Sequence, residues 1–271
     1  MHATVRGLVR ACHPEPTLAV TAVAAGIAVS AGRPPWGVLL VAAAVLTGQL
    51  SVGWLNDYLD AARDREVGRT DKPIATGLVK KRIVGAAACC ASAACVPLSF
   101  TTGLLAGGVH LVAVVSAWAY DAGVKSTRLS VLPYALSFGL LPVFVVLTSG
   151  QAPPWWLFTA GALLGSGAHF ANALPDLADD ARTGVHGLPH LLGPRWSSWA
   201  AVALLLGAMT CLVAGPAGAP SVAGLSLLAA ACLVLTAALA PRRGSGSRAL
   251  FRAIMAVALL AVVLLLITPL G

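Results

Sequence analysis

Two short segments of the chain place carboxylate and amide side chains at spacings that suit a metal site. The first contains Asn56, Asp57, Asp60 and Asp64, and the second contains Asn172, Asp176 and Asp180. Residues three or four positions apart share one face of an α-helix, so each set predicts a row of oxygen atoms along a helix. Like charges on one face repel each other unless a cation lies among them. Because the ligands are oxygen atoms, without histidine or cysteine, the pattern favours Mg²⁺.

A simpler interpretation is that the acidic residues only balance the charge of the basic loops around them. It explains Glu66, Asp71 and Asp179 equally well, since none of the three belongs to either spaced set. It does not explain why two matching sets occur in separate halves of the chain. We therefore expect the aspartates of both sets to hold Mg²⁺ and to act in catalysis, with Asn56 and Asn172 as further ligands.

Basic residues accompany the two sets in the same predicted loops. They are Arg63, Arg69, Lys72, Lys125 and Arg128. Lysine and arginine bind phosphate oxygen atoms, arginine with two parallel hydrogen bonds. Metal ions and basic side chains at one place predict a ligand with many negative oxygen atoms, and a diphosphate fits that description.

An isoprenyl diphosphate would match a diphosphate site that lies beside apolar helices. Metal ions and basic groups stabilise the leaving diphosphate and so promote cleavage of the C–O bond to an allylic carbocation. Apolar surroundings exclude the water that would quench this cation, and aromatic faces stabilise it. The aromatic candidates, each of which also fits ordinary packing, are Trp54, Tyr58, Trp118, Tyr120, Tyr134, Phe138 and Phe170.

The composition places these residues in a membrane protein. Hydrophobic residues make up 58% of the 271 residues, charged residues make up 10%, and the mean hydropathy is +0.85. A soluble domain has about 25% charged residues, so too little polar surface remains here to cover a water-soluble globule. The net charge of +8 does not indicate nucleic-acid binding, because the basic residues lie in short connections between apolar segments. The cysteines have no spacing typical of a zinc site and are interpreted as packing residues.

Nine segments are apolar and long enough to predict membrane-spanning helices of about 20 residues. They are roughly 17–31, 36–58, 82–100, 104–121, 129–149, 155–175, 195–214, 220–240 and 249–269. If the N-terminus is cytoplasmic, every basic residue except Arg33 falls on the cytoplasmic side, as the positive-inside rule requires. We therefore expect an all-α polytopic bundle around a central cavity, with the C-terminus outside and the active site facing the cytoplasm of the plasma (inner) membrane. Residues 1–271 would form one transmembrane domain with two pseudo-repeated halves.

The motifs resemble those of the UbiA superfamily of intramembrane prenyltransferases. The first signature of that superfamily, NDxxDxxxD followed by RTxxRP, is similar to NDYLDAARDREVGRTDKPIATG at 56–77. The second aspartate motif is similar to NALPDLADD at 172–180, and the Tyr-and-Lys motif to YDAGVKS at 120–126. The resemblance implies that the asparagines and aspartates hold Mg²⁺ and the diphosphate. It also implies diphosphate binding by Arg69, Lys72, Tyr120 and Lys125.

Two positions depart from the pattern of that superfamily. Lys72 stands where an arginine is common, which exchanges a two-pronged contact for a point charge. Asp121 stands where a small or hydroxyl residue is frequent. It is either an extra acid near the acceptor or a partner for Lys125 or Arg128.

The leading hypothesis is Mg²⁺-dependent transfer of an isoprenyl group from its diphosphate to an aromatic acceptor. A terpene cyclase, in which double bonds of the same isoprenyl chain capture the cation, would use the same ionising residues. No basic residue lies in the middle of a predicted span to bind an acidic acceptor, which favours a neutral or phenolic acceptor or cyclisation.

An ion-coupled transporter is a hypothesis from another class. Transporters hold their ions near the bilayer midplane, whereas the acids of this chain lie at one predicted membrane face. The loop at 184–194 could cover the site. Its two histidines, His186 and His190, have a spacing that metal sites use, which we interpret as incidental.

Overall fold

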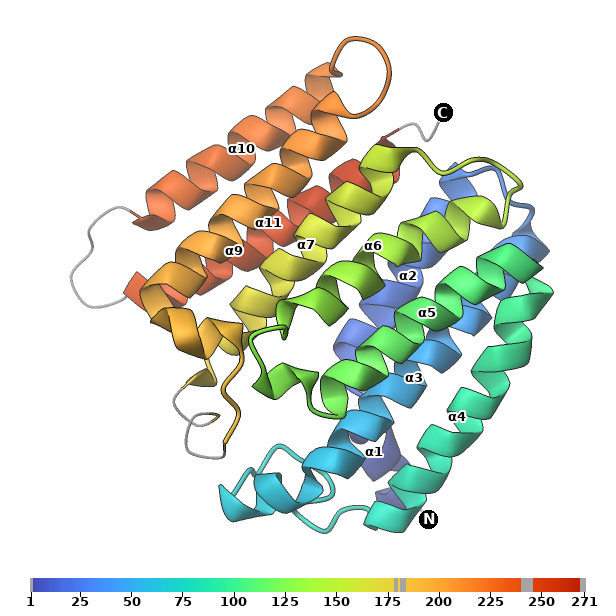
Figure 1. The fold of residues 1–271 in the computed structure, drawn as a ribbon, viewed down its shortest axis with the longest axis vertical. Helices are drawn as coiled ribbons and strands as arrows, with labels where there is room; N and C mark the ends of the chain where they lie inside the picture. Colours follow the sequence, from blue (N-terminus) through green and yellow to red (C-terminus); the bar gives the residue numbers. More distant parts are fainter. Residues whose placement is uncertain (1, 178–179, 181–183, 240–245, 269–271) are drawn as a thin grey trace. The chain divides into compact units, whose positions relative to one another are not determined.

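The computed structural model describes residues 2–177, 180, 184–239 and 246–268, which form helices and their connections (Figure 1). The helices are α1 (His2–Ala11), α2 (Pro14–Ser30), α3 (Pro35–Glu66), α4 (Lys81–Thr101), α5 (Leu104–Asp121), η1 (Val124–Ser126), α6 (Val131–Leu147), α7 (Trp155–Ala173), α9 (Leu188–Ala214), α10 (Val222–Leu239) and α11 (Gly246–Ile267). No strand occurs within these described ranges, so the predicted all-α class is confirmed.

Each of the nine predicted apolar segments coincides with a helix. Four helices, α3, α4, α5 and α9, have the length and hydropathy of a membrane span, and shorter apolar stretches occur in α2, α6, α10 and α11. The chain is therefore an integral membrane protein, while the count of nine spans stays a prediction. The sequence did not predict α1, because its ten residues form a helix with one polar and one apolar face and so contain no apolar run.

Proline and glycine set the ends of the helices that matter for the first aspartate set. Pro35 lies in the first turn of α3, where its missing N–H needs no partner within the helix. Gly68 follows the end of α3 with a φ of 68°, a left-handed conformation that glycine adopts without strain. The N–H of Arg69 then donates to the carbonyl of Asp64 at 2.9 Å. These signals let α3 continue past the apolar segment and carry the aspartates.

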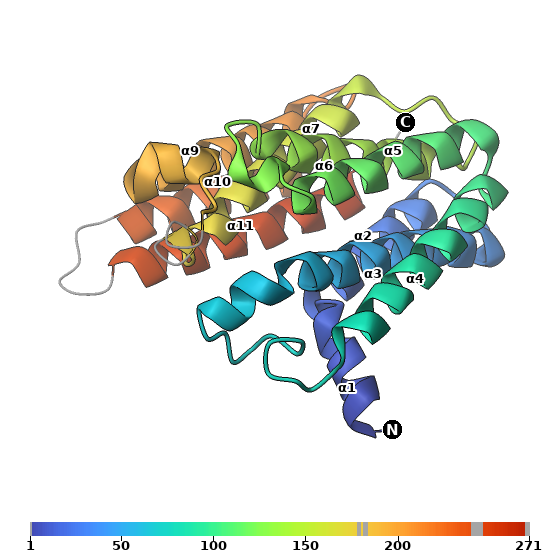
Figure 2. The ribbon, with the colours of Figure 1, turned by 60° about the horizontal axis from the view of Figure 1, so that its bottom comes forward.

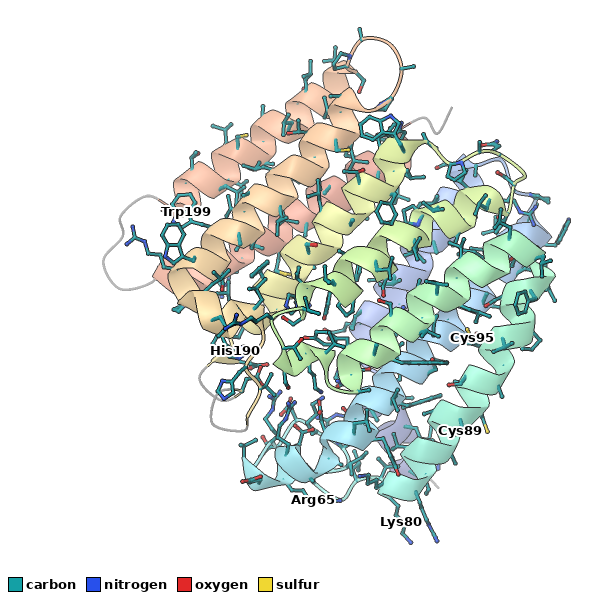
Figure 3. All side chains as sticks on the ribbon, in the orientation of Figure 1. Arg65, Lys80, Cys89, Cys95, His190 and Trp199 are labelled. Carbon is teal, nitrogen blue, oxygen red and sulfur yellow. The ribbon has the colours of Figure 1, made fainter. Side chains whose placement is uncertain are left out.

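The chain divides into two compact units, and the first contains Met1–Val124 and Phe144–Gln151. Within it, α3 packs against α2, α4 and α5, and α1 runs at a steep angle to α2 (Figure 2). Figure 3 shows Arg65, in the last turn of α3, and Lys80, just before α4, at the same end of this unit. This is the end at which the first aspartate set lies.

The second unit contains Lys125–Val143 and Ala152–Gly271. Within it, α7 packs against α9, and α9 packs against α10 and α11. Close contact of α7 with α6 depends on glycine, since a Cβ atom at Gly161 would lie 2.4 Å from the carbonyl oxygen of Phe138. The second aspartate set follows the end of α7.

Candidate functional site

The first aspartate set lies on the last turns of α3, as its spacing predicted. Asp57, Asp60 and Asp64 are buried, with 1%, 8% and 4% of their surface exposed. Three buried carboxylates on one helix face would repel each other strongly without nearby positive charge or hydrogen-bond donors. The surrounding loop and the N-terminal segment supply such groups.

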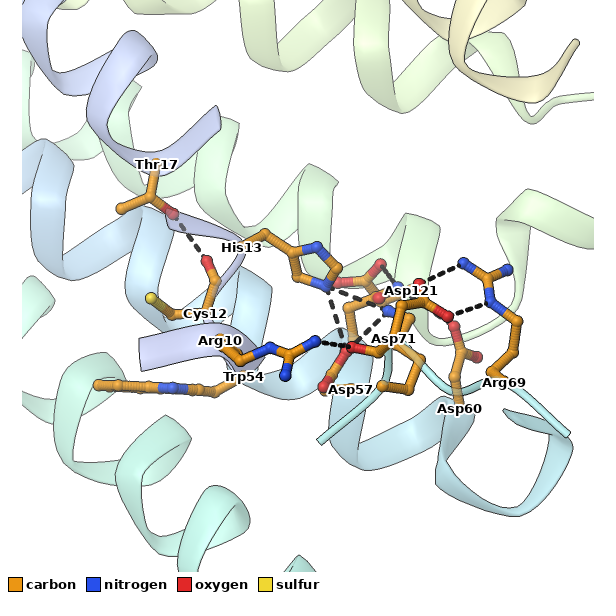
Figure 4. Close-up of polar contacts among 12 residues, drawn as sticks. Arg10, Cys12, His13, Thr17, Trp54, Asp57, Asp60, Arg69, Asp71 and Asp121 are labelled. Carbon is orange, nitrogen blue, oxygen red and sulfur yellow. Dashed lines mark hydrogen bonds and ion pairs between the residues drawn. The ribbon is translucent and has the colours of Figure 1, made fainter. Parts of the chain in front are cut away.

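Asp57 accepts hydrogen bonds on one of its two carboxylate oxygens (Figure 4). The ammonium of Lys72 donates to Oδ1 at 2.7 Å, and Nε2 of His13 lies 3.1 Å from the same atom. The two nitrogens are 3.2 Å apart. The other oxygen, Oδ2, is buried and has no hydrogen-bond partner among the described residues. Asp57 therefore presents one satisfied oxygen and one that is still able to bind a positive group.

Asn56 connects two carboxylates from different helices. Its Nδ2 donates to Oδ1 of Asp121 at 3.0 Å and lies 3.3 Å from Oδ2 of Asp60. Asp121 ends α5 and is buried. Arg63 donates to the same Oδ2 of Asp60 at 2.9 Å. The structure thus gives Asp121 a partner, Asn56, that the sequence did not indicate.

The loop after α3 holds a second ion pair at its surface. Nε and Nη2 of Arg69 donate to the two carboxylate oxygens of Asp71, both at 2.8 Å. These hydrogen bonds lower the pKa of Asp71 to about 2. Arg10 from α1 donates to the backbone carbonyl of Asp71 at 3.3 Å. The loop that carries Arg69 and Lys72 is therefore fixed both to α1 and to the aspartates.

The second aspartate set does not continue α7 as the spacing predicted. Asn172 lies in α7, but the helix ends at Ala173, and Asp176 belongs to the turn that follows. Pro175 explains the difference, because it has no N–H to donate within the helix. The N–H of Asp180 donates to the carbonyl of Asp176 at 2.8 Å, so the backbones of the two aspartates are in contact. Asp179 lies outside the described residues.

A histidine contacts the second set, which the sequence did not predict. Nε2 of His190 lies 3.7 Å from Oδ2 of Asp180. The rings of His186 and His190 meet edge to face with centroids 6.4 Å apart. His169, buried within α7, lies 3.0 Å from the hydroxyl of Ser130. His169 shows that an ionisable side chain does lie in the middle of an apolar helix, whereas the lysines and arginines of the described apolar helices lie towards the helix ends.

Lys125 lies in η1, beside the loop that precedes α9. A Cβ atom at Gly187 would be 2.5 Å from the carbonyl oxygen of Lys125, so the two backbones are in close contact. The N–H of Leu188 donates to the hydroxyl of Ser130 at 2.9 Å. Arg128 is exposed in the connection between η1 and α6. The local fold thus holds the backbone of Lys125 in a fixed place.

The aromatic candidates fall into two groups. In the second unit, the ring of Tyr134 is 5.9 Å from that of Phe138 and 5.0 Å from that of His169, and the ring of His169 is 5.6 Å from that of Phe170. In the first unit, three rings have polar or charged neighbours. Trp54 donates to the carbonyl of Leu8, Trp118 donates to Ser51, and Tyr58 lies under the ammonium of Lys81. Tyr120, near the end of α5, is half-buried.

The donor atoms fit a hard metal ion that is shared with a ligand. Within the described part of the chain, no three His, Cys, Asp or Glu side chains converge as a ready-made metal cage. Mg²⁺ does not require one, since it keeps several waters and is commonly held by one or two carboxylates and by phosphate oxygens. The buried Oδ2 of Asp57 is an oxygen of the required kind.

Solved structures of UbiA homologues have a similar fold. A homologue from Archaeoglobus fulgidus, bound to DMAPP and Mg²⁺, has 13% identity and a TM-score of 0.70 over 96% of this chain and 99% of that chain. A homologue from Aeropyrum pernix K1 has 22% identity and a TM-score of 0.72 over 91% of this chain and 95% of that chain. A structure of digeranylgeranylglyceryl phosphate synthase has 15% identity and a TM-score of 0.75 over 100% of this chain and 99% of that chain. No curated protein matches the sequence.

The sequence also matches a protein family directly. Residues 17–260 match the UbiA prenyltransferase family. This stretch contains both aspartate sets and all the cations predicted to bind phosphate, so the resemblance of the motifs is confirmed. The chain belongs to the UbiA prenyltransferase family.

Proposed function

We propose that the protein is a Mg²⁺-dependent intramembrane prenyltransferase that ionises an isoprenyl diphosphate and transfers the prenyl group to an acceptor. The observation that carries this proposal is the state of Asp57. Its carboxylate is buried, one oxygen is held by Lys72 and His13, and the other has no hydrogen-bond partner among the described residues. A buried oxygen of this kind costs free energy unless a positive group binds it. The Mg²⁺ in the solved homologue supports the choice of metal.

The residues of the chain then have separate roles. The aspartates and asparagines of both sets would hold Mg²⁺, which when bound supplies positive charge to the leaving diphosphate. Lys72 has three donor hydrogens, and its hydrogen bond to Asp57 leaves at least one for a phosphate oxygen. Further phosphate contacts would come from Arg63, Arg69, Lys125, Arg128 and Tyr120. Apolar helices would keep water from the allylic cation.

The identity of the acceptor separates two hypotheses that share this ionisation step. A transferase passes the cation to an aromatic or other small-molecule acceptor. In a terpene cyclase, double bonds of the isoprenyl group itself capture the cation. The aromatic group of Tyr134, Phe138 and Phe170 suits either outcome, since aromatic faces stabilise cations. We favour transfer to a neutral or phenolic acceptor, because no lysine or arginine lies in the middle of an apolar helix that the structure describes, where it could bind an acidic one.

The topology forms part of the proposal. We place the N-terminus and both aspartate sets on the cytoplasmic side of the inner membrane, with the C-terminus outside. The variant Lys80→Cys, in an otherwise cysteine-free protein, tests whether this end of the protein faces the cytoplasm. It should react with a membrane-impermeant maleimide in inverted vesicles and not in intact cells.

The function is tested with purified protein in detergent or nanodiscs. Farnesyl or geranylgeranyl diphosphate with Mg²⁺ should release diphosphate, and chelation should stop the release. Asp57→Ala and Asp176→Ala should each abolish it while the protein remains folded, whereas Glu66→Ala, an exposed acid on the same helix, should keep it. Retained turnover in either aspartate variant would overturn the proposal. Products formed without a phenolic acceptor would indicate a cyclase, and dependence on the acceptor a transferase.

A further inference from the structure

A histidine from the N-terminal segment meets the first aspartate set. His13 joins α1 to α2, and its Nε2 lies 3.1 Å from Oδ1 of Asp57, 44 residues further along the chain (Figure 4). His13 belongs to neither aspartate set and lies outside every motif that marked the site in the sequence.

The backbone at His13 has an unusual conformation. Its φ of 53° and ψ of 69° are left-handed, and among the described residues no other residue except glycine has a positive φ. Residues with a Cβ atom rarely adopt this conformation, although histidine does so more often than most. The chain holds it at the residue whose ring contacts the most buried aspartate of the set.

Three contacts fix the elbow between α1 and α2. A Cβ atom at Gly53 would lie 2.5 Å from the carbonyl oxygen of Cys12, so only glycine allows this approach of α3. Thr17 donates to that same carbonyl at 2.8 Å. Trp54 donates to the carbonyl of Leu8 at 2.9 Å. The ring of His13 therefore extends from a rigid support that is attached to α3 next to Asp57.

The chemistry of the contact determines the direction of the hydrogen bond. An ionised carboxylate only accepts, so the contact with Asp57 is a hydrogen bond in the tautomer that carries the proton on Nε2 of His13, and in that tautomer Lys72 donates to Asp57 and not to His13. Lys72 donates to the same oxygen. Both donors therefore occupy Oδ1, and the carboxylate is held in an orientation that leaves Oδ2 as its free ligand atom.

We propose that His13 is a positioning residue, which fixes the carboxylate of Asp57 so that Oδ2 binds Mg²⁺. This inference rests on the proposed function. Side chains that bond to metal ligands set the orientation of those ligands, and their loss commonly lowers metal affinity by about 10- to 100-fold. His13 would act in this way from a segment that precedes the first predicted span.

The test measures binding of Mn²⁺, as a paramagnetic substitute for Mg²⁺, to the full-length protein by EPR titration. His13→Gly removes the ring and favours the left-handed backbone, so it separates the ring from the fold of the elbow. His13→Gln places an amide N–H near the position of Nε2. His13→Asn also tolerates the left-handed backbone, but its amide is too short to reach Asp57. Melting temperatures in detergent report on the fold of each variant.

We expect His13→Gly and His13→Asn to bind Mn²⁺ about tenfold more weakly, with unchanged melting temperatures. His13→Gln should recover most of the affinity. Equal affinity in the wild type and His13→Gly would overturn the inference, as would equal weakening in the Gly and Gln variants. If the wild type binds no Mn²⁺ even with isoprenyl diphosphate present, the proposed function fails instead, so the two failures are distinguishable.

Discussion

Asn56 and Asp121 are 65 residues apart, yet Nδ2 of the amide donates to Oδ1 of the carboxylate at 3.0 Å. The same Nδ2 lies 3.3 Å from Oδ2 of Asp60. An amide nitrogen has two hydrogens, and here each meets a carboxylate oxygen. The network therefore fixes the orientation of the amide, and its oxygen remains the atom that can bind a metal ion.

Removal of Asp121 should disturb this orientation. Asp121→Ala takes away one of the two acceptors, so we expect Mn²⁺ or Mg²⁺ affinity to fall about tenfold, measured by calorimetry. Asp121→Asn keeps an oxygen that accepts the hydrogen bond from Asn56 and should retain most of the affinity. If the asparagine variant binds as weakly as the alanine variant, the charge of Asp121 matters and not its hydrogen bond.

Lys72 neutralises a carboxylate that is almost fully buried. Lys72→Met keeps the length of the side chain but removes the charge beside Asp57, and loss of one partner of a buried pair costs about 3 kcal/mol. We expect a lower melting temperature in metal-free detergent solution, with partial recovery on addition of Mg²⁺.

The double variant Lys72→Met/Asp57→Asn is the control for this prediction. Without a carboxylate at position 57 there is no unpaired buried charge there, so the double variant should be more stable than Lys72→Met alone and should respond less to Mg²⁺. Equal melting temperatures of the two variants would mean that solvent already neutralises Asp57.

The sequence predicted the features of the site that depend on local spacing. The aspartates at 57, 60 and 64 share a face because α3 continues to Glu66, and that continuation follows from the helical period alone. The end of α7 is also encoded locally, because Pro175 is a signal that ends the helix before Asp176.

The contacts of His13 and Asp121 could not be predicted in the same way. The bond from His13 to Asp57 requires a left-handed residue between two helices and a glycine on α3, and no spacing in one segment encodes that combination. The partner of Asp121 depends on how α5 packs against α3. A single sequence contains no signal for such long-range pairs.

Asp71 offers a prediction about pH. Hydrogen bonds from Arg69 lower its pKa to about 2, below the ordinary value of 3.8 that applies when the chain is unfolded. Stability from this pair is therefore fully present above pH 4 and is lost as the pH falls towards 2. The side chain is 58% exposed, so the effect should be small. The melting temperatures of the wild type and Asp71→Asn should differ at pH 5 and converge near pH 2; a difference that persists there would contradict the assignment.

The backbone of Lys125 depends on the absence of a side chain at Gly187. A Cβ atom at this position would meet the carbonyl oxygen of Lys125 at 2.5 Å and the hydroxyl of Ser130 at 2.9 Å. Backbone atoms cannot yield as the end of a flexible side chain can, so η1 or the loop before α9 must move. Ser130 would be displaced together with its contacts to Leu188 and His169.

Gly187→Ala should therefore misplace the ammonium that we propose for diphosphate binding. A displacement of about 1 Å can cost up to 100-fold in rate, so we expect kcat/KM for the isoprenyl diphosphate to fall at least tenfold, chiefly through a higher KM. Gly207→Ala is the matched control, because its Cβ would meet only Cδ1 of Leu163 at an ordinary 3.5 Å. Steady-state release of diphosphate measures both variants. If Gly187→Ala keeps the KM of the wild type, Lys125 does not bind the diphosphate from the place that η1 gives it.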